Sequence, residues 1–344
     1  MGQRAKTFQH IADILSFQIP HQDLKRSLSD PGFDWDAIVV VGSEHLVLPA
    51  IYCRLKSKQL LSLLPKDLNT YLEKLSAINR NRNNALLEQM HSISQLLNAH
   101  QIEHVFLKGA ALLAHGCLED LAERMVGDID ILISKAQIHQ AFNLLKQQEY
   151  SETFGFAYEN TGFRHLDRLI SKKRLAAVEL HNELLTPDQR HCIDVEDVLK
   201  TKVLRKDIPI PNEYYTTLHH ILAWQINDLG FYYKSIHFKY LYDSLCLKVF
   251  TKNHLIAELL MHRYGRSYLQ CAKLYFKEFS EIESDKSMIR YGRSHQKYRD
   301  QRFYRTILTP LKQSYKFTTH RIHLLLFNPS YRQHAFKKIF ILEK

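Results

Sequence analysis

The sequence is poor in cysteine, and its few cysteines are scattered. The chain of 344 residues contains five, which are far apart and never form a C-x-x-C pair. Disulfide-stabilised domains use an even set of cysteines, and structural zinc sites use closely spaced Cys or His pairs. The pattern therefore indicates neither kind of site, and a reducing cytoplasm fits it best. The cysteines are Cys53, Cys117, Cys192, Cys246 and Cys271.

Long apolar runs are also missing. No uninterrupted apolar segment approaches the ~20 residues that a helix needs to cross a bilayer. Residues 1–17 are amphipathic and lack the long apolar segment of a secretory signal peptide. We therefore expect a cytoplasmic protein with no transmembrane segment.

Several common functional motifs do not occur. Neither the P-loop pattern nor the glycine fingerprint of dinucleotide-binding folds is present. There is no Ser/His/Asp or Cys/His nucleophile motif in a recognisable context, and no internal repeat. These absences argue against P-loop, Rossmann and solenoid folds.

Acidic residues are scarce near the C-terminus. The net charge of the chain is +11, and residues 286–344 contain 14 Lys and Arg against 2 Asp and Glu. The preceding 285 residues are nearly neutral, so this segment holds all of the basic excess. Its mixture of cations and aromatics suits a nucleic-acid backbone or an anionic membrane surface, and it equally suits a solvated tail.

Residues 104–115 predict a strand, a turn and a helix in immediate succession. The apolar run His104-Val105-Phe106-Leu107 stops at Lys108-Gly109, and a helix-favouring segment, Ala110–His115, follows. A helix N-terminus directs free backbone N–H groups and a positive dipole end to one point. With Lys108 beside it, this junction is a candidate phosphate site.

Two carboxylates follow about twenty residues later, at Asp128 and Asp130. They begin an apolar strand, Val126–Ile133, in which side chains two residues apart share a face. Two like charges this close repel each other unless a cation or hydrogen bonds compensate them. The spacing therefore predicts a shared divalent cation, with Ile129, Ile131 and Ile133 facing a core.

These motifs resemble a known family. The combination Leu107-Lys108-Gly109, then Arg124, then Gly127-Asp128-Ile129-Asp130-Ile131-Leu132-Ile133 is similar to the uncharacterised nucleotidyltransferase family found in many bacteria, often encoded near enzymes of surface-polysaccharide or peptide modification. That family belongs to the polymerase-beta-like nucleotidyltransferase superfamily. The resemblance covers roughly residues 35–250. Most superfamily members carry Gly-Ser or Gly-Gly where this chain has Lys108-Gly109, so the hydroxyl that usually grips a nucleotide phosphate is missing. Lys108 could substitute for it as a cation.

The resemblance implies a third carboxylate, and Glu179 is the candidate. In the segment Arg174–His181, Val178 and Leu180 share an apolar face, whereas Glu179 and His181 point the other way. If this strand lies beside the first, Glu179 faces the same side as Asp128 and Asp130. The Glu-Leu-His order matches the family pattern, in which this acidic residue helps hold the second metal.

The expected architecture is α+β: a small mixed β-sheet nucleotidyltransferase core flanked by N- and C-terminal helical regions. We place the helical N-terminal region at 1–101, the core at 102–185, the helical C-terminal region at 186–285 and a basic, aromatic-containing tail at 286–344. A long helix is predicted over 68–101 and antiparallel strands over 154–159 and 163–170, joined by a turn at 160–162. Residues 34–41 fit helix and strand equally.

By this resemblance, the chain transfers a nucleoside monophosphate from an NTP to an acceptor hydroxyl. Asp128, Asp130 and Glu179 would hold Mg²⁺ (or Mn²⁺) and serve catalysis. Lys108, the Gly109 backbone and Arg124 would bind the nucleotide, although Arg124 could equally pair with an Asp of the site. The acceptor could be a sugar, a protein, a peptide or RNA. The alternative is a binding module that keeps the fold, weakened in catalysis by the loss of the Gly-Ser grip.

Overall fold

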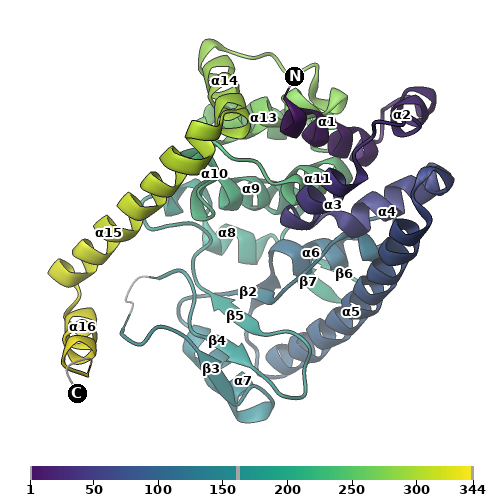
Figure 1. Ribbon diagram of the computed structural model, residues 1–344. Coiled ribbons are helices and arrows are strands. Elements are labelled where there is room, and N and C mark those ends of the chain that lie inside the picture. The colour runs from purple at the N-terminus through teal and green to yellow at the C-terminus, as the bar shows by residue number, and fades with distance from the viewer. Residues whose placement is uncertain (1, 160–162, 342–344) are drawn as a thin grey trace.

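The computed structural model describes residues 2–159 and 163–341, and its fold is α+β (Figure 1). One five-stranded sheet has the order β1-β2-β5-β4-β3. The predicted turn at 160–162 lies outside the described residues. The strands of this sheet are β1 (His104–Phe106), β2 (Ile129–Ile133), β3 (Glu152–Phe154), β4 (Arg168–Ile170) and β5 (Val178–His181).

The sheet is mixed, and β2 lies near its centre. β2 pairs antiparallel with β1 and parallel with β5, whereas β4 pairs antiparallel with both β5 and β3. All five residues of β2 are buried. Strands β3 and β4 are shorter than the strands predicted at 154–159 and 163–170. The chain leaves the ladder at Gly155 and rejoins it at Arg168. Among the residues that the structure describes between these two, His165 forms an isolated bridge with His181.

One face of the sheet is covered by three helices, α5 (Lys66–Ala99), α6 (Lys108–His115) and α7 (Ile138–Gln148). Their apolar side chains join those of the sheet in one cluster, which includes Met90, Ala111, Leu145 and Ile131. Alternation along β2 places Asp130 and Leu132 on the opposite face. The site is therefore built on the face away from this cluster.

The polar stretch in the middle of α5 holds the loop that leads to the site. Asn79 and Asn83 are buried, and both donate side-chain hydrogen bonds to the carbonyl oxygen of Arg124, at 3.1 and 2.7 Å. Arg82 donates to the carbonyl oxygens of Val126 and Gly127. These side chains satisfy backbone acceptors that have no ladder partner, so they fix residues 124–127 ahead of β2.

Helices precede α5 along the chain. Residues 35–44 are helical in spite of the β-branched run Val39-Val40-Val41, because the Asp34 side chain caps the helix by accepting from the Ala37 N–H at 2.9 Å. The N-terminal helices are α1 (Gln3–Leu15), α2 (His21–Leu28), α3 (Trp35–Glu44) and α4 (Leu48–Ser57), followed by the 3₁₀ turn η1 (Leu61–Leu63).

The chain beyond β5 is mainly helical. A small hairpin, β6 (Val203–Arg205) and β7 (Ile208–Ile210), interrupts it; Pro209, which lacks a backbone N–H, pairs opposite Leu204. The helices are α8 (Val195–Lys200), α9 (Glu213–Leu222), α10 (Gly230–Tyr233), α11 (Phe238–Cys246), α12 (Asn253–Met261), α13 (Arg263–Tyr275), α14 (Lys286–Asp300), α15 (Thr309–Phe327) and α16 (Pro329–Ile341). The short helical turns of this part are η3 (Arg190–Cys192), η4 (Ala223–Asn227), η5 (Val249–Thr251), η6 (Lys277–Phe279) and η7 (Tyr304–Leu308), whereas η2 (Leu121–Glu123) lies between α6 and β2.

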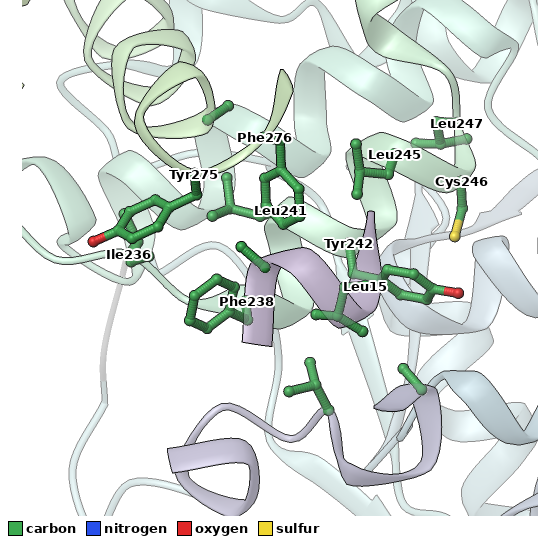
Figure 2. Packing of buried hydrophobic residues seen from close by; sticks show 14 of the residues in the cluster. Leu15, Ile236, Phe238, Leu241, Tyr242, Leu245, Cys246, Leu247, Tyr275 and Phe276 are labelled. Carbon is green, nitrogen blue, oxygen red and sulfur yellow. The ribbon is translucent and has the colours of Figure 1, made fainter. Parts of the chain in front are cut away.

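Helices from both ends of the chain share one hydrophobic core. Leu15 of α1 packs in the same cluster as Phe238 and Tyr242 of α11 and Phe276 after α13, as Figure 2 shows. Full burial of such aromatic side chains contributes on the order of 2 kcal/mol each. This core lies between the N-terminal helices and α9–α14, on the site side of the sheet (Figure 1). None of the described helices combines the length and apolar character that crossing a membrane requires.

Candidate active site

The sheet register brings two of the predicted carboxylates together. Asp130 on β2 is paired directly with Glu179 on the parallel strand β5. Directly paired residues project from the same face of a sheet, so both carboxylates point away from the α5 cluster. Asp128 lies just before β2, two residues from Asp130. The structure thus gathers Asp128, Asp130 and Glu179 on one face of the sheet, at the N-terminal ends of β2 and β5.

Asp130 is held by two basic side chains. Its Oδ1 accepts hydrogen bonds from Lys108 Nζ at 2.6 Å and from His181 Nε2 at 2.7 Å, and the residue is only 2 % exposed. Burial alone raises the pKa of the Asp130 carboxyl, but the Lys108 ammonium and His181 outweigh burial and hold it well below its ordinary value. Asp130 is therefore an anion at neutral pH.

Arg168 bridges the other two carboxylates. Its Nη2 donates to Asp128 Oδ2 at 2.9 Å and to Glu179 Oε1 at 2.6 Å, and its Nε also donates to Glu179 Oε1. Because Leu169 pairs antiparallel with Val178, Arg168 lies opposite Glu179 on the neighbouring strand β4. Arg168 was not predicted, because its only sequence signal was its place on an expected strand whose pairing was unknown.

The two carboxylates that Arg168 bridges have different protonation behaviour. Burial raises the pKa of Glu179, but His181 and Arg168 more than offset it, so that pKa falls to about 2. Burial raises the pKa of Asp128, and the nearby charges of Asp130 and Glu179 raise it further. A divalent cation would reverse this repulsion, because it favours the charged form of every carboxylate around it.

The donors closest to a metal-binding arrangement are Asp130, Glu179 and His181. One ligand atom from each lies within 4.8 Å of the others. Asp128 lies outside this group, and its carboxylate accepts from Arg168. Two carboxylates and an imidazole form a donor set that can hold a divalent cation, with oxygen ligands predominating. His181 was noted in the sequence only for the order Glu-Leu-His.

Lys108 and Gly109 form the first turn of α6, which begins two residues before the helix predicted at Ala110–His115. Lys108 has a φ of +51°, in the left-handed region that a non-glycine residue seldom adopts, and its ammonium reaches Asp130. A Cβ added at Gly109 would lie 3.0 Å from Val126 Cγ2, so a side chain there would press against the loop that precedes β2. The first turn of α6 therefore lies close against the Asp128 loop.

Arg124 lies beside the site, but its strongest contact is with a helix of the C-terminal region. Its Nε donates to Asp243 Oδ2 of α11 at 2.9 Å, and its Nη1 donates to the carbonyl oxygen of Met125. Arg124 is 5 % exposed and Asp243 is fully buried. The sequence left two partners open for Arg124, a phosphate and an Asp of the site. In the structure its partner is an Asp, but this Asp belongs to α11 and not to the carboxylate cluster.

A cavity of about 160 Å³ opens beside these residues. Lys108, Arg124, Asp128 and Asp130 form one wall, and residues of the helices beyond β5 form the other. Sequence patterns did not single out the second wall, because its residues come from separate helices. Its polar members, together with Arg164, are His220, Asn227, Asp228, Lys239 and Tyr240.

Lys239 and Tyr240 give the second wall a cation and an aromatic ring. Burial and the neighbouring Arg124 lower the pKa of Lys239 to about 8. The Tyr240 ring stacks on Trp224, with centroids 4.9 Å apart, and its hydroxyl donates to Asp228. With Lys108 and Arg164, this wall suits a ligand that combines several negative charges with a flat ring.

Glu123, next to Arg124, provides a test that uses pH. Glu123 is 2 % exposed, and burial raises its pKa from 4.5 to about 7. The folded protein then binds more protons than the unfolded chain between these values, so stability falls as pH rises through this window. We expect Glu123→Gln to raise the free energy of unfolding by about 1–3 kcal/mol above pH 7.

The measurement is urea unfolding of wild type and Glu123→Gln at about pH 8 and about pH 5. The difference between the two proteins should shrink at the lower pH, where the wild-type carboxyl is neutral in the folded protein. Glu152→Gln, a change of the same kind at an exposed position of β3, serves as the control. An equal difference at both pH values would contradict the expectation.

Comparison with known proteins agrees with this geometry. A family model described as an uncharacterised nucleotidyltransferase matches residues 31–272, from α3 through most of α13. A comparison with curated proteins finds no matching relative. The matched part contains the whole sheet, the carboxylates and both walls of the cavity. The chain therefore belongs to this family of uncharacterised nucleotidyltransferases.

Proposed function

We propose that the protein transfers a nucleoside monophosphate from an NTP to an acceptor hydroxyl and releases pyrophosphate. The observation that carries this proposal is the direct pairing of Asp130 with Glu179 on adjacent parallel strands, with Asp128 at the start of β2. A cation-lined cavity lies beside them. Phosphoryl transfer depends mainly on positioning and charge neutralisation, which this arrangement supplies.

Asp128, Asp130 and Glu179 are the residues that would hold Mg²⁺ or Mn²⁺. His181 lies beside Asp130 and Glu179, and it could be a ligand only if its Nε2 gives up the proton that it donates to Asp130. When bound, the metal supplies neutralisation of the triphosphate and a lower proton affinity of the attacking hydroxyl. His181 also has a role of its own: its Nε2–H bond to Asp130 orients that carboxylate.

The cations of the site would bind phosphate. Lys108 and Arg168 now neutralise the three carboxylates, and both would be released to phosphate oxygens once a divalent cation takes over that neutralisation. The first-turn N–H groups of α6 at Gly109 add an uncharged phosphate contact. Arg124 stays paired with Asp243 and contributes positive potential to the same cavity. Tyr240 is the candidate stacking surface for the base.

The alternative is a module that binds a nucleotide without turning it over. One observation favours it: Lys108 stands where the superfamily usually has a small residue, and its ammonium already occupies Asp130. A cation held this firmly competes with a metal for the same oxygen. Both proposals require nucleotide binding at the same site, so turnover separates them.

The test combines two measurements on the full chain. Calorimetry with Mg²⁺ and each of the four common NTPs reports binding, and a pyrophosphate-release assay reports turnover. The acceptor panel should include free sugars, a peptide, an RNA and the protein's own side chains, with mass spectrometry of the products. Turnover with any acceptor supports the enzyme, binding without turnover supports the module, and absence of binding contradicts both.

A further inference from the structure

The C-terminal arm, residues 301–338, contacts the body of the protein near its two ends and leaves most of α15 exposed. Near α16, the Asn328 side-chain amide donates to the carbonyl oxygen of Glu159, and the Glu159 N–H donates to the Ser330 hydroxyl. The family match ends at residue 272, and α14, which follows it, is packed in the main core through Met288 and Tyr291. The arm begins after α14. Its long helix α15 runs along the outer side of the molecule toward α16, as the yellow-green ribbon in Figure 1 shows.

The arm exposes an unusual amount of apolar surface. Of the 19 residues of α15, only Leu324 is buried among those that the structure describes. Five exposed side chains, spaced by four, seven, three and one residues, form a stripe along one side of the helix. They are Leu311, Tyr315, Ile322, Leu325 and Leu326, and their exposed fractions range from 40 to 68 %.

A helix with so little packing lacks its usual source of stability. In folded proteins, a helix is stabilised chiefly by burial of its apolar face. Contiguous exposed apolar surface of this kind marks an interaction site. The α15 stripe is thus the face that needs a partner.

Charge restricts the partner. The arm, residues 301–338, contains eight Lys and Arg and no Asp or Glu. A second copy of the arm would bring like charges together, so self-association is disfavoured. An anionic partner is favoured by the same count.

The direction in which Lys312 and Lys316 point distinguishes between two kinds of anionic partner, a nucleic acid and a lipid surface. Lys312 lies over the rings of Tyr298 and Tyr232, at 4.6 and 5.2 Å from the centroids, and Lys316 also lies over Tyr232. These two cations face the body of the protein, and the stripe faces outward. A nucleic-acid backbone requires cations at the contact, whereas a lipid surface accepts an apolar stripe with cations beside it.

The end of α15 indicates a fluid surface and not a protein groove. Leu325, Leu326 and Phe327 are consecutive, so they point in three directions around the helix, and all three are exposed. A groove buries one narrow stripe, whereas acyl chains adapt to a broader apolar surface. We propose that the C-terminal arm docks α15 on an anionic phospholipid membrane, with Arg321, Lys337 and Lys338 at the headgroups.

The experiment is vesicle co-sedimentation of the full chain. The vesicles consist of phosphatidylcholine alone or of phosphatidylcholine mixed with phosphatidylglycerol. The stripe variant carries Leu311→Ser, Ile322→Ser and Leu326→Ser. The control variant carries Ile78→Ser, Leu204→Ser and Met261→Ser, which remove apolar side chains of the body that are at least as exposed as those of the stripe. Circular dichroism checks that both variants keep the helical content of the wild type.

We expect the wild type and the control variant to sediment with the anionic vesicles and not with the neutral ones. The stripe variant should bind anionic vesicles at least about tenfold more weakly, because it loses three buried side chains at the interface. Failure of the wild type to bind anionic vesicles would overturn the proposal, and so would equal binding by the stripe variant. Binding of single-stranded RNA or of an acidic protein, with no binding of vesicles, would assign the arm to that partner instead.

Discussion

Asp130→Asn should reduce the rate of pyrophosphate release by about a thousandfold or more. The substitution keeps the shape of the side chain but removes the charge that both a divalent cation and Lys108 require. A metal ion contributes several kcal/mol of transition-state stabilisation, and each 1.36 kcal/mol corresponds to a factor of ten in rate. The assay is steady-state pyrophosphate release with saturating Mg²⁺ and the NTP that calorimetry identifies.

Two further variants define what this result means. Asp36→Asn changes an exposed Asp in the first turn of α3 and should leave the rate unchanged. Asp130→Asn also leaves Lys108 without its partner, so Asp130→Asn combined with Lys108→Gln should recover stability without recovering activity. Calorimetric titration with Mn²⁺ should show weaker binding to the single and the double variant than to the wild type. Retention of more than a tenth of the wild-type rate by Asp130→Asn would remove this carboxylate from the catalytic set.

Asp243→Ala should lower the free energy of unfolding by about 3–5 kcal/mol, because it leaves the guanidinium of Arg124 buried without its carboxylate. Asp243 is fully buried on α11, and Arg124 is almost fully buried in the loop before β2. The pair thus connects the helices beyond β5 to the loop that carries the site. Urea unfolding, followed by circular dichroism, measures the change.

An exposed ion pair provides the comparison. Glu152 and Lys172 form a salt bridge at 3.0 Å, and both side chains are largely in solvent. Glu152→Ala should therefore change stability by no more than about 1 kcal/mol. Arg124→Met combined with Asp243→Leu removes both charges at once, and it should recover much of the loss seen with Asp243→Ala. A loss below about 1 kcal/mol for Asp243→Ala would show that water or another group already compensates Arg124.

The elements with local signals were predictable from the sequence. The structure contains the predicted strand before Lys108 and the predicted helix after it. It also shows the predicted alternation along β5, in which the side chains of Val178 and Glu179 point to opposite faces of the sheet. The pairing of Glu179 with Asp130 was expected from resemblance, because alternation fixes a face but does not name the neighbouring strand. Residues 35–44 are helical, and the Asp34 side chain caps this helix. The sequence alone did not decide between helix and strand here, because the β-branched run favours a strand and the cap favours a helix.

The rest of the site depends on contacts between distant segments. Arg168 reaches Asp128 across 40 residues of sequence, and Arg124 reaches Asp243 across 119. Neither pairing has a periodic signal, because each follows from the way the strands and helices pack. The asparagines of α5 lie in a polar stretch of the kind that usually faces solvent, yet Asn79 and Asn83 are buried against backbone carbonyls. These two side chains can be buried because the carbonyl oxygens of the loop before β2 accept their hydrogen bonds. The sequence does not show that this loop packs against α5.

The direct pairing of Asp130 with Glu179 also determines which changes of chain length the site tolerates during evolution. Their separation along the chain has no importance of its own, because the backbone ladder sets their distance. Relatives with longer or shorter segments outside the strands would keep the two acids adjacent. A single residue inserted within β5, ahead of Glu179, would shift the strand's phase and turn this acid toward the apolar cluster. A genome search for such sites should therefore allow any number of residues between the two strands. It should require that each acid keeps its position in the alternation of its own strand.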